Sequence, residues 1–159
     1  MPDAAPISIE ELAGRLPPGR PLVGLDVGTK TIGIAVSDRN RQIATPRETI
    51  RRGKFGPDAA RLLELARQER AAAVIVGLPI NMDGSEGPRA QSTRAFARNL
   101  AQLTDLAIAF WDERLSSAAV ERMLIEADRS RARRAEIVDK LAAAYILQGA
   151  LDRLARIAE

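Results

Sequence analysis

Two apolar runs joined by a short turn constrain the fold of this chain most strongly. Residues 22–27 and 31–37 flank Gly28-Thr29-Lys30, and this pattern is typical of a β-hairpin. Because side chains alternate along a strand, Gly24 and Asp26 share one face, and the glycine leaves room for a ligand. A lone carboxylate near the end of an apolar strand is costly unless it is paired or binds a metal. Capping of the turn is the simpler alternative for Asp26.

The segments after this hairpin alternate between strand and helix patterns, which predicts an α/β fold. Strands are expected over residues 42–50 (an edge strand, because of Pro46), 71–78 and 106–111. Helices are expected from Pro57, over 89–103, after Ser116 or Ser117 to about 127, and from about 135 onward. Residues 128–134 are predicted to be a basic linker. Strand–helix–strand units imply parallel strands with right-handed crossovers.

The length of 159 residues predicts one domain, preceded by an extension over residues 1–20. In this extension Ser8 is expected to cap a short helix. The domain itself is assigned to residues 21–159. The sequence shows no secretory signal and no apolar run long enough for a membrane span, which points to a cytoplasmic protein.

The chain contains no cysteine and no histidine, and this absence excludes several kinds of chemistry. A cysteine nucleophile, a Ser-His triad, a histidine base and a Cys/His zinc site are all ruled out. A catalytic metal would be held mainly by oxygen atoms, which favours Mg²⁺ or Mn²⁺.

Basic residues are concentrated in two segments, although the net charge is only +3. Residues 39–54 contain six basic residues and one acidic residue, and residues 129–134 contain four arginines. Such clusters suggest a phosphate-rich partner, although an ordinary solvated surface is the alternative. The candidate phosphate contacts in these segments are Arg51, Arg52, Arg133 and Arg134.

Three acidic residues occupy positions where acids are unexpected: Asp26, Glu113 and Asp139. Glu113 follows an apolar strand at the end where α/β sheets bind ligands, and Asp139 lies on a small apolar helix stripe. Glu113 could instead pair with Arg114, and Asp139 could merely favour a helix N-terminus. Together the three acids suit a divalent-cation site that activates water and clamps a phosphate.

Four motifs resemble the YqgF family, also called RuvX, of the ribonuclease H-like superfamily. They cover about residues 21–150 and occur in the family's order: GLDVGTK from Gly24, GLPINMDGS from Gly77, DERLSS from Asp112, and VDK from Val138 followed by LAAAYILQ. The resemblance implies a five-stranded mixed sheet flanked by helices, with Asp26, Glu113 and Asp139 as metal ligands. It also implies a divalent-metal nuclease that is usually described as processing the 16S rRNA precursor.

Several hypotheses about the substrate and its contacts stay open at this stage. Lys30 and Arg114 are further candidate phosphate contacts, and Asn81 and Ser116 are weaker candidates for positioning substrate. The leading interpretation is an Mg²⁺- or Mn²⁺-dependent endonuclease acting on structured RNA, as a monomer or a homodimer. A junction-cleaving DNA nuclease, an ATPase of the actin and sugar-kinase kind, and a non-catalytic RNA-binding module are the alternatives.

Overall fold

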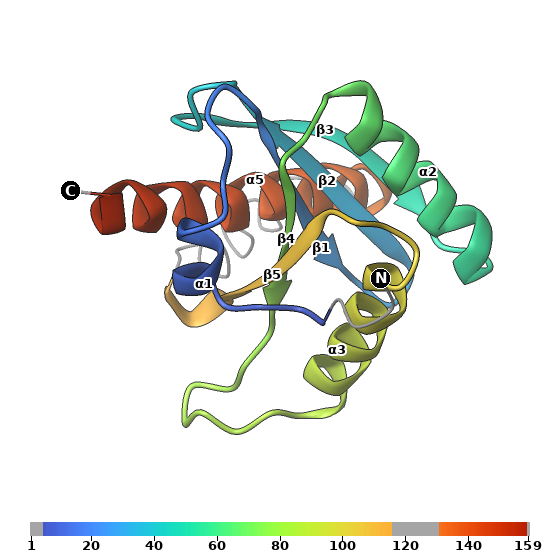
Figure 1. Ribbon diagram of the computed structural model, residues 1–159. Helices are drawn as coiled ribbons and strands as arrows, with labels where there is room; N and C mark the ends of the chain where they lie inside the picture. Colours follow the sequence, from blue (N-terminus) through green and yellow to red (C-terminus); the bar gives the residue numbers. More distant parts are fainter. Residues whose placement is uncertain (1–4, 116–130, 159) are drawn as a thin grey trace.

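A five-stranded mixed sheet forms the centre of the protein (Figure 1). The computed structural model describes residues 5–115 and 131–158, and of residues 115 and 131–139 it describes the backbone alone. In spatial order the strands are β3 (Ala44–Arg51), β2 (Thr31–Ser37), β1 (Leu22–Val27), β4 (Ala73–Leu78) and β5 (Ala107–Asp112). β2 is antiparallel to both β1 and β3, whereas β4 is parallel to both β1 and β5. The predicted α/β architecture with a hairpin at its start is therefore confirmed.

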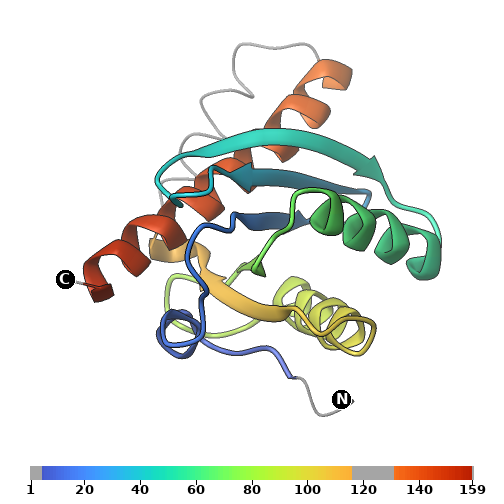
Figure 2. The ribbon, with the colours of Figure 1, turned by 45° about the horizontal axis from the view of Figure 1, so that its top comes forward.

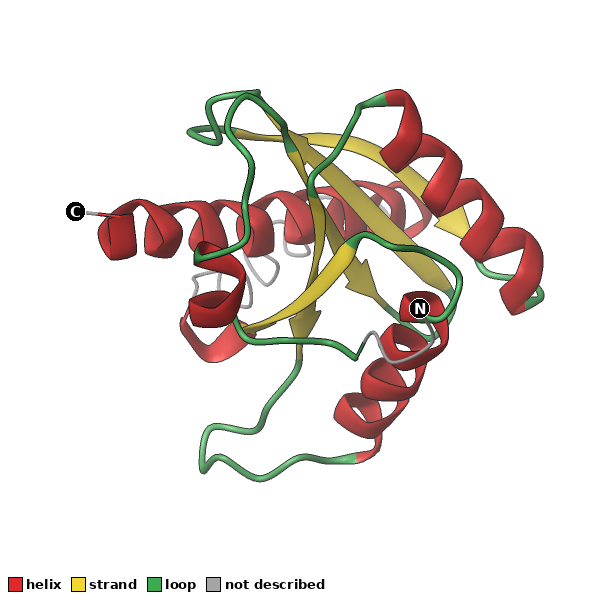
Figure 3. Ribbon diagram, viewed as in Figure 1, coloured by secondary structure: helices red, strands yellow, loops and turns green. Residues whose placement is uncertain are grey.

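Helices cover both faces of the sheet (Figures 2 and 3). One face packs against α2 (Phe55–Gln68) and α3 (Pro88–Ala101), and the other packs against α1 (Ile9–Ala13) and α5 (Arg131–Ala158). The alternation of β1 explains this division, because Val23 and Leu25 belong to the first core and Leu22 to the second. A short 3-10 turn, η1 (Glu113–Leu115), follows β5.

The edge strand β3 contains Pro46, as the sequence predicts. Ile34 pairs with Glu48 and Ala35 pairs with Pro46, so the register of the β2–β3 ladder shifts by one residue at this point. Proline cannot donate a ladder hydrogen bond and is tolerated at such bulges.

The N-terminal segment lies along the opposite edge of the sheet. The Ile7 amide donates to the Ile108 carbonyl over 2.8 Å, and the Phe110 amide donates to the Ile7 carbonyl over 3.0 Å. Ser8 caps α1 by accepting a hydrogen bond from the Glu11 amide, as predicted. The segment thus packs directly on β5 and contributes to the core under α5.

The last helix begins earlier than predicted. α5 starts at Arg131, so Arg133 and Arg134 lie in the helix and not in a linker. Arginine is a good helix former, and the basic run therefore does not interrupt the helix.

α5 packs closely against the sheet at Gly24. A Cβ atom at this position would lie 2.7 Å from Leu147 Cβ and 3.2 Å from the Ala143 carbonyl oxygen. The expectation that Gly24 leaves room for a ligand is wrong, because α5 fills this space.

Candidate active site

Four strands end at one edge of the sheet, which we call the carboxyl edge. β1, β4 and β5 are parallel, and β3 has the same direction as β1 because both are antiparallel to β2. The loops that follow β1, β3, β4 and β5 therefore meet at this edge, where α/β sheets bind their ligands.

Asp26 lies near the end of β1 and is only 3% exposed. It shares the face of Gly24, which is covered by α5. Its partner in β2 is Gly33, and continuing the register of β1 with β4 places Gly77 on its other side. Because Gly77 has no side chain, Ile146 of α5 packs closely against the sheet beside Asp26.

Glu113 approaches the same glycine from β5. A Cβ atom on Gly77 would lie 3.3 Å from Glu113 Cγ and 2.4 Å from Ile146 Cδ1. Glu113 follows the end of β5 and is half-buried. The side chain of Glu113 therefore lies over Gly77, on the face of the sheet that carries Asp26.

Asp139 lies in α5, one helical turn before Ala143. Its side chain is outside the described part of the structure. Among the side chains that are described, no three acidic or other ligand groups form a metal cluster. The chemistry of the two described carboxylates nevertheless fits a hard divalent cation, which prefers oxygen ligands.

The predicted cationic contacts fall into two groups. Lys30 and Arg51 are exposed at the carboxyl edge, in the β1–β2 turn and at the end of β3. Arg52 is half-buried: its Nη1 donates to the Gly28 carbonyl over 2.7 Å, and its guanidinium lies 5.5 Å from the centre of the Phe96 ring. Arg52 therefore braces the turn after Asp26.

Arg114 and Asn81 form contacts within the protein. The Arg114 guanidinium donates to both carboxylate oxygens of Asp112, and these hydrogen bonds hold the pKa of Asp112 below its usual range. Asn81 Nδ2 donates to Ser85 Oγ over 3.0 Å and stabilises the loop after β4. Ser116 lies outside the described residues, as do the side chains of Arg133 and Arg134.

Two further cationic residues lie at this edge: Arg89 was missed by the sequence analysis, and Lys54 was counted in the basic segment 39–54 but not chosen as a phosphate contact. Arg89, in the first turn of α3, places Nη2 3.4 Å from the Val27 carbonyl oxygen, directly after Asp26. Lys54 is exposed and immediately precedes α2. Arg89 could have been identified from its position, because it is a basic residue at the end of the loop that follows a buried strand.

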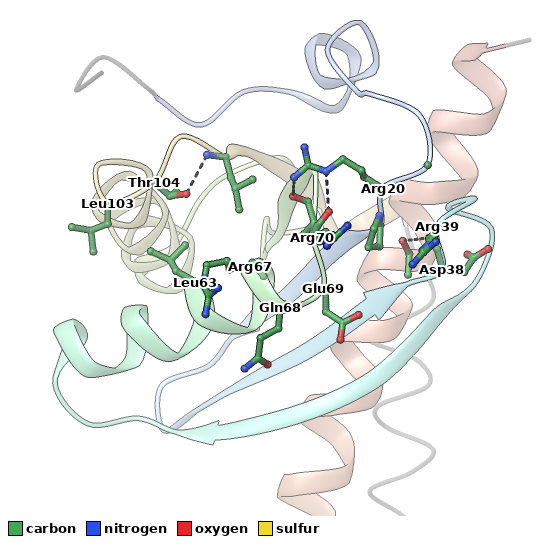
Figure 4. A pocket seen from close by; sticks show the side chains of 16 residues that line it. Arg20, Asp38, Arg39, Leu63, Arg67, Gln68, Glu69, Arg70, Leu103 and Thr104 are labelled. Carbon is green, nitrogen blue, oxygen red and sulfur yellow. Dashed lines mark hydrogen bonds between the residues drawn. The ribbon is translucent and has the colours of Figure 1, made fainter.

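A wide cavity of about 1180 Å³ lies at the edge of the sheet where β1 begins, opposite the carboxyl edge (Figure 4). Arg20, Arg39 and Arg70 are among the residues that line it, and Arg20 donates to the carbonyls of Arg70 and Ala71. The cavity involves the start of β1 and the end of α2, so it is separate from the carboxylates. No helix in the described ranges is long and apolar enough to span a membrane.

The fold belongs to the ribonuclease H-like class, as comparison with solved structures shows. The structure of T. thermophilus RuvC with a Holliday junction substrate aligns with a TM-score of 0.55 at 15% identity, covering 84% of this chain and 94% of that one. The yeast mitochondrial Holliday junction resolvase Ydc2 aligns with a TM-score of 0.51 at 10% identity, covering 94% and 85% of the two chains.

The sequence assigns the chain more narrowly. The profile of the RuvX family, described as Holliday junction resolvase, matches residues 20–153, and the chain belongs to this family. Curated relatives named "Putative pre-16S rRNA nuclease" include one from Ruegeria pomeroyi, 65% identical over 92% of this chain and 96% of the relative. Another, from Nitrobacter winogradskyi, is 66% identical over 96% and 93%.

Proposed function

We propose that this protein is a divalent-metal-dependent nuclease that hydrolyses phosphodiester bonds in structured RNA, in 5′ processing of the 16S rRNA precursor. One observation carries the proposal: the buried Asp26 and the side chain of Glu113 flank Gly77 at the carboxyl edge of the sheet. The names of the most similar curated relatives support the substrate, and the family assignment supports the reaction class.

Asp26, Glu113 and Asp139 would hold Mg²⁺ or Mn²⁺ in this proposal. The bound cation would activate a water molecule and neutralise charge on the phosphate. The chain's own contribution is positional. Ile146 is fully buried and packs against Gly77, between the two carboxylates. Arg52 and Arg89 donate hydrogen bonds to the backbone carbonyls that follow Asp26.

Cleavage of four-way DNA junctions is the second candidate function. The family description and the resolvase-like fold favour it, because junction resolution uses the same type of carboxylate site. A resolvase is expected to cut paired strands as a symmetric dimer, whereas an RNA-processing enzyme can act as a monomer. We propose a cytoplasmic location for either activity, where RNA precursors and DNA are both accessible.

The decisive experiment compares both substrates side by side. Purified protein with Mn²⁺ is incubated with 16S precursor RNA and with a four-way DNA junction, and the products are separated on denaturing gels. The variants Asp26→Asn, Glu113→Gln and Asp139→Asn should each lose more activity than the roughly 10- to 100-fold typical of residues around a metal site. Asp152→Asn, an exposed carboxylate in α5, is the matched control and should keep full activity.

Melting curves test the metal site independently of the substrate. At a free metal concentration of about 100 times the dissociation constant, metal binding should raise the free energy of unfolding of the wild type by about 2.7 kcal/mol. The three site variants should show a much smaller response at fixed ionic strength. An equal response in wild type and variants would show that these acids do not share a metal.

A further inference from the structure

Four exposed cationic side chains lie on the segments next to the end of β1, near Asp26. They are Lys30 in the β1–β2 turn, Arg51 at the end of β3, Lys54 before α2, and Arg89 at the start of α3. Backbone contacts bring two of their segments together: Thr31 pairs with Arg51, and the Arg52 amide donates to the Lys30 carbonyl over 2.8 Å.

Contacts between the two helices complete this arrangement. The ring of Phe55, next to Lys54, lies 5.3 Å from the ring of Phe96 in α3, the helix whose first turn contains Arg89. Arg89 in turn reaches the Val27 carbonyl. The four cations therefore lie on neighbouring segments at the carboxyl edge, and we call them the cationic rim (Lys30, Arg51, Lys54 and Arg89).

The charges of the cationic rim are not neutralised within the described part of the chain. None of its four side chains forms an ion pair with a described residue. The acids nearest in sequence have other partners: Glu48 pairs with Arg61, and Glu86 pairs with Arg94. Asp58 is buried and accepts a hydrogen bond from the Gly53 amide. Four positive charges without an ion-pair partner among the described side chains create a strong local attraction for polyanions.

The side of the site formed by the end of β5 carries acidic residues. Beyond Gly77, the end of β5 carries Asp112 and Glu113, and the Arg114 guanidinium is bonded to Asp112. Hydrogen bonds from Ser85 lower the pKa of Asp83, in the loop after β4, and the charge of Arg114 adds a smaller effect in the same direction. This side offers a phosphate backbone no free positive charge among the described side chains.

From this asymmetry we infer that the nucleic-acid strand extends from Asp26 over the cationic rim, and that Lys54 and Arg89 bind phosphates beside the cleaved bond. The inference rests on the proposed nuclease function and adds the path of the substrate. Arginine contacts phosphate through two parallel N–H groups and lysine through a point charge, so both residue types suit a backbone contact without base readout.

Salt-dependent binding tests the path without requiring catalysis. A fluorescein-labelled RNA stem–loop is titrated with protein in EDTA, and affinity is measured by anisotropy between about 50 and 200 mM salt. The double variants Arg51→Ala/Arg89→Ala and Lys30→Ala/Lys54→Ala should each lower the log–log salt slope by about 1.4 to 1.8, because each lost phosphate contact removes about 0.7 to 0.9.

A matched control separates the path from a simple effect of net charge. Arg39→Ala/Arg98→Ala removes the same charge from exposed positions near the opposite edge of the sheet and should leave the slope unchanged. An equal loss in this control, or an unchanged slope in both rim variants, would overturn the inference. Failure of wild-type cleavage with Mn²⁺ would instead refute the nuclease proposal, since binding in EDTA does not depend on it.

Crosslinking gives a second, direct test. The chain has no cysteine, so Lys54→Cys, Arg89→Cys and the control Arg39→Cys each create a single thiol. After labelling with a photoreactive maleimide, the first two variants should crosslink to the RNA stem–loop at least about ten-fold more than the control, since a phosphate-contacting position lies next to the bound strand. Equal crosslinking from all three positions would contradict a defined path.

Discussion

Replacing Gly77 by alanine tests whether close packing positions Glu113. The added Cβ would lie 2.4 Å from Ile146 Cδ1 and 3.0 Å from Ile146 Cγ1, distances that require Ile146 to move. Ile146 is fully buried, so it has little space to change its rotamer. Glu113 Cγ, at 3.3 Å, would also have to shift by a few tenths of an ångström.

The magnitude follows from two opposing terms. Overpacking a core costs about 1 to 3 kcal/mol, and alanine in place of glycine in a strand recovers about 0.5 to 1 kcal/mol. The net loss of up to about 2.5 kcal/mol lowers the melting temperature of a chain of this size by up to roughly 10 °C. Because a displacement of 1 Å can cost about 100-fold in rate, a smaller shift of Glu113 should reduce cleavage about ten-fold.

A second substitution separates stability from activity. Ile146→Val removes the Cδ1 atom and alone should cost about 0.5 to 1.5 kcal/mol. The double variant Gly77→Ala/Ile146→Val should be about as stable as Ile146→Val, yet its cleavage rate should stay low because the contact with Glu113 remains. Urea titration and single-turnover cleavage measure the two effects. If Gly77→Ala melts like wild type and cleaves at the wild-type rate, the packing argument fails.

Two further predictions concern other contacts. Hydrogen bonds from Arg61 lower the pKa of Glu48, so this pair stabilises the fold above the unfolded-state pKa of about 4.3, and the stabilisation is lost as pH falls through the lower folded-state pKa. Urea titrations should therefore find Arg61→Gln less stable than wild type at pH 7 and equally stable near pH 2. In Gly149→Ala the new Cβ would lie 2.9 Å from Trp111 Nε1, so the emission of this single tryptophan should shift and stability should fall by up to about 2 kcal/mol. An unchanged spectrum would show that Trp111 does not move.

The strands could be predicted from the sequence because each depends on a local pattern of apolar and turn residues. The turn between β1 and β2 follows from its glycine and flanking apolar runs, and Pro46 identifies an edge strand. The same signals placed Asp26 and Glu113 at strand ends, where the structure has them. The convergence of Asp139 with these acids stays a prediction.

Tertiary contacts explain what the sequence could not reveal. Arg52 was predicted to bind phosphate like its neighbour Arg51, but its side chain reaches back to Gly28 and packs on Phe96, a residue distant in sequence. Gly24 suggested open space, and only the position of α5 shows that this space is filled. A run of arginines likewise gave no sign that α5 begins at Arg131.

The packing of α5 on β1 also has a consequence for synthesis of the protein. Gly24 and Leu147 are in contact although about 120 residues separate them in the chain. At translation rates of about 5 to 20 residues per second, β1 waits roughly 6 to 24 s for this helix. During that interval the sheet face of Asp26 is uncovered and Asp139 does not yet exist. The face of the sheet that carries Asp26 is therefore completed only when the helix after all five strands has been synthesised.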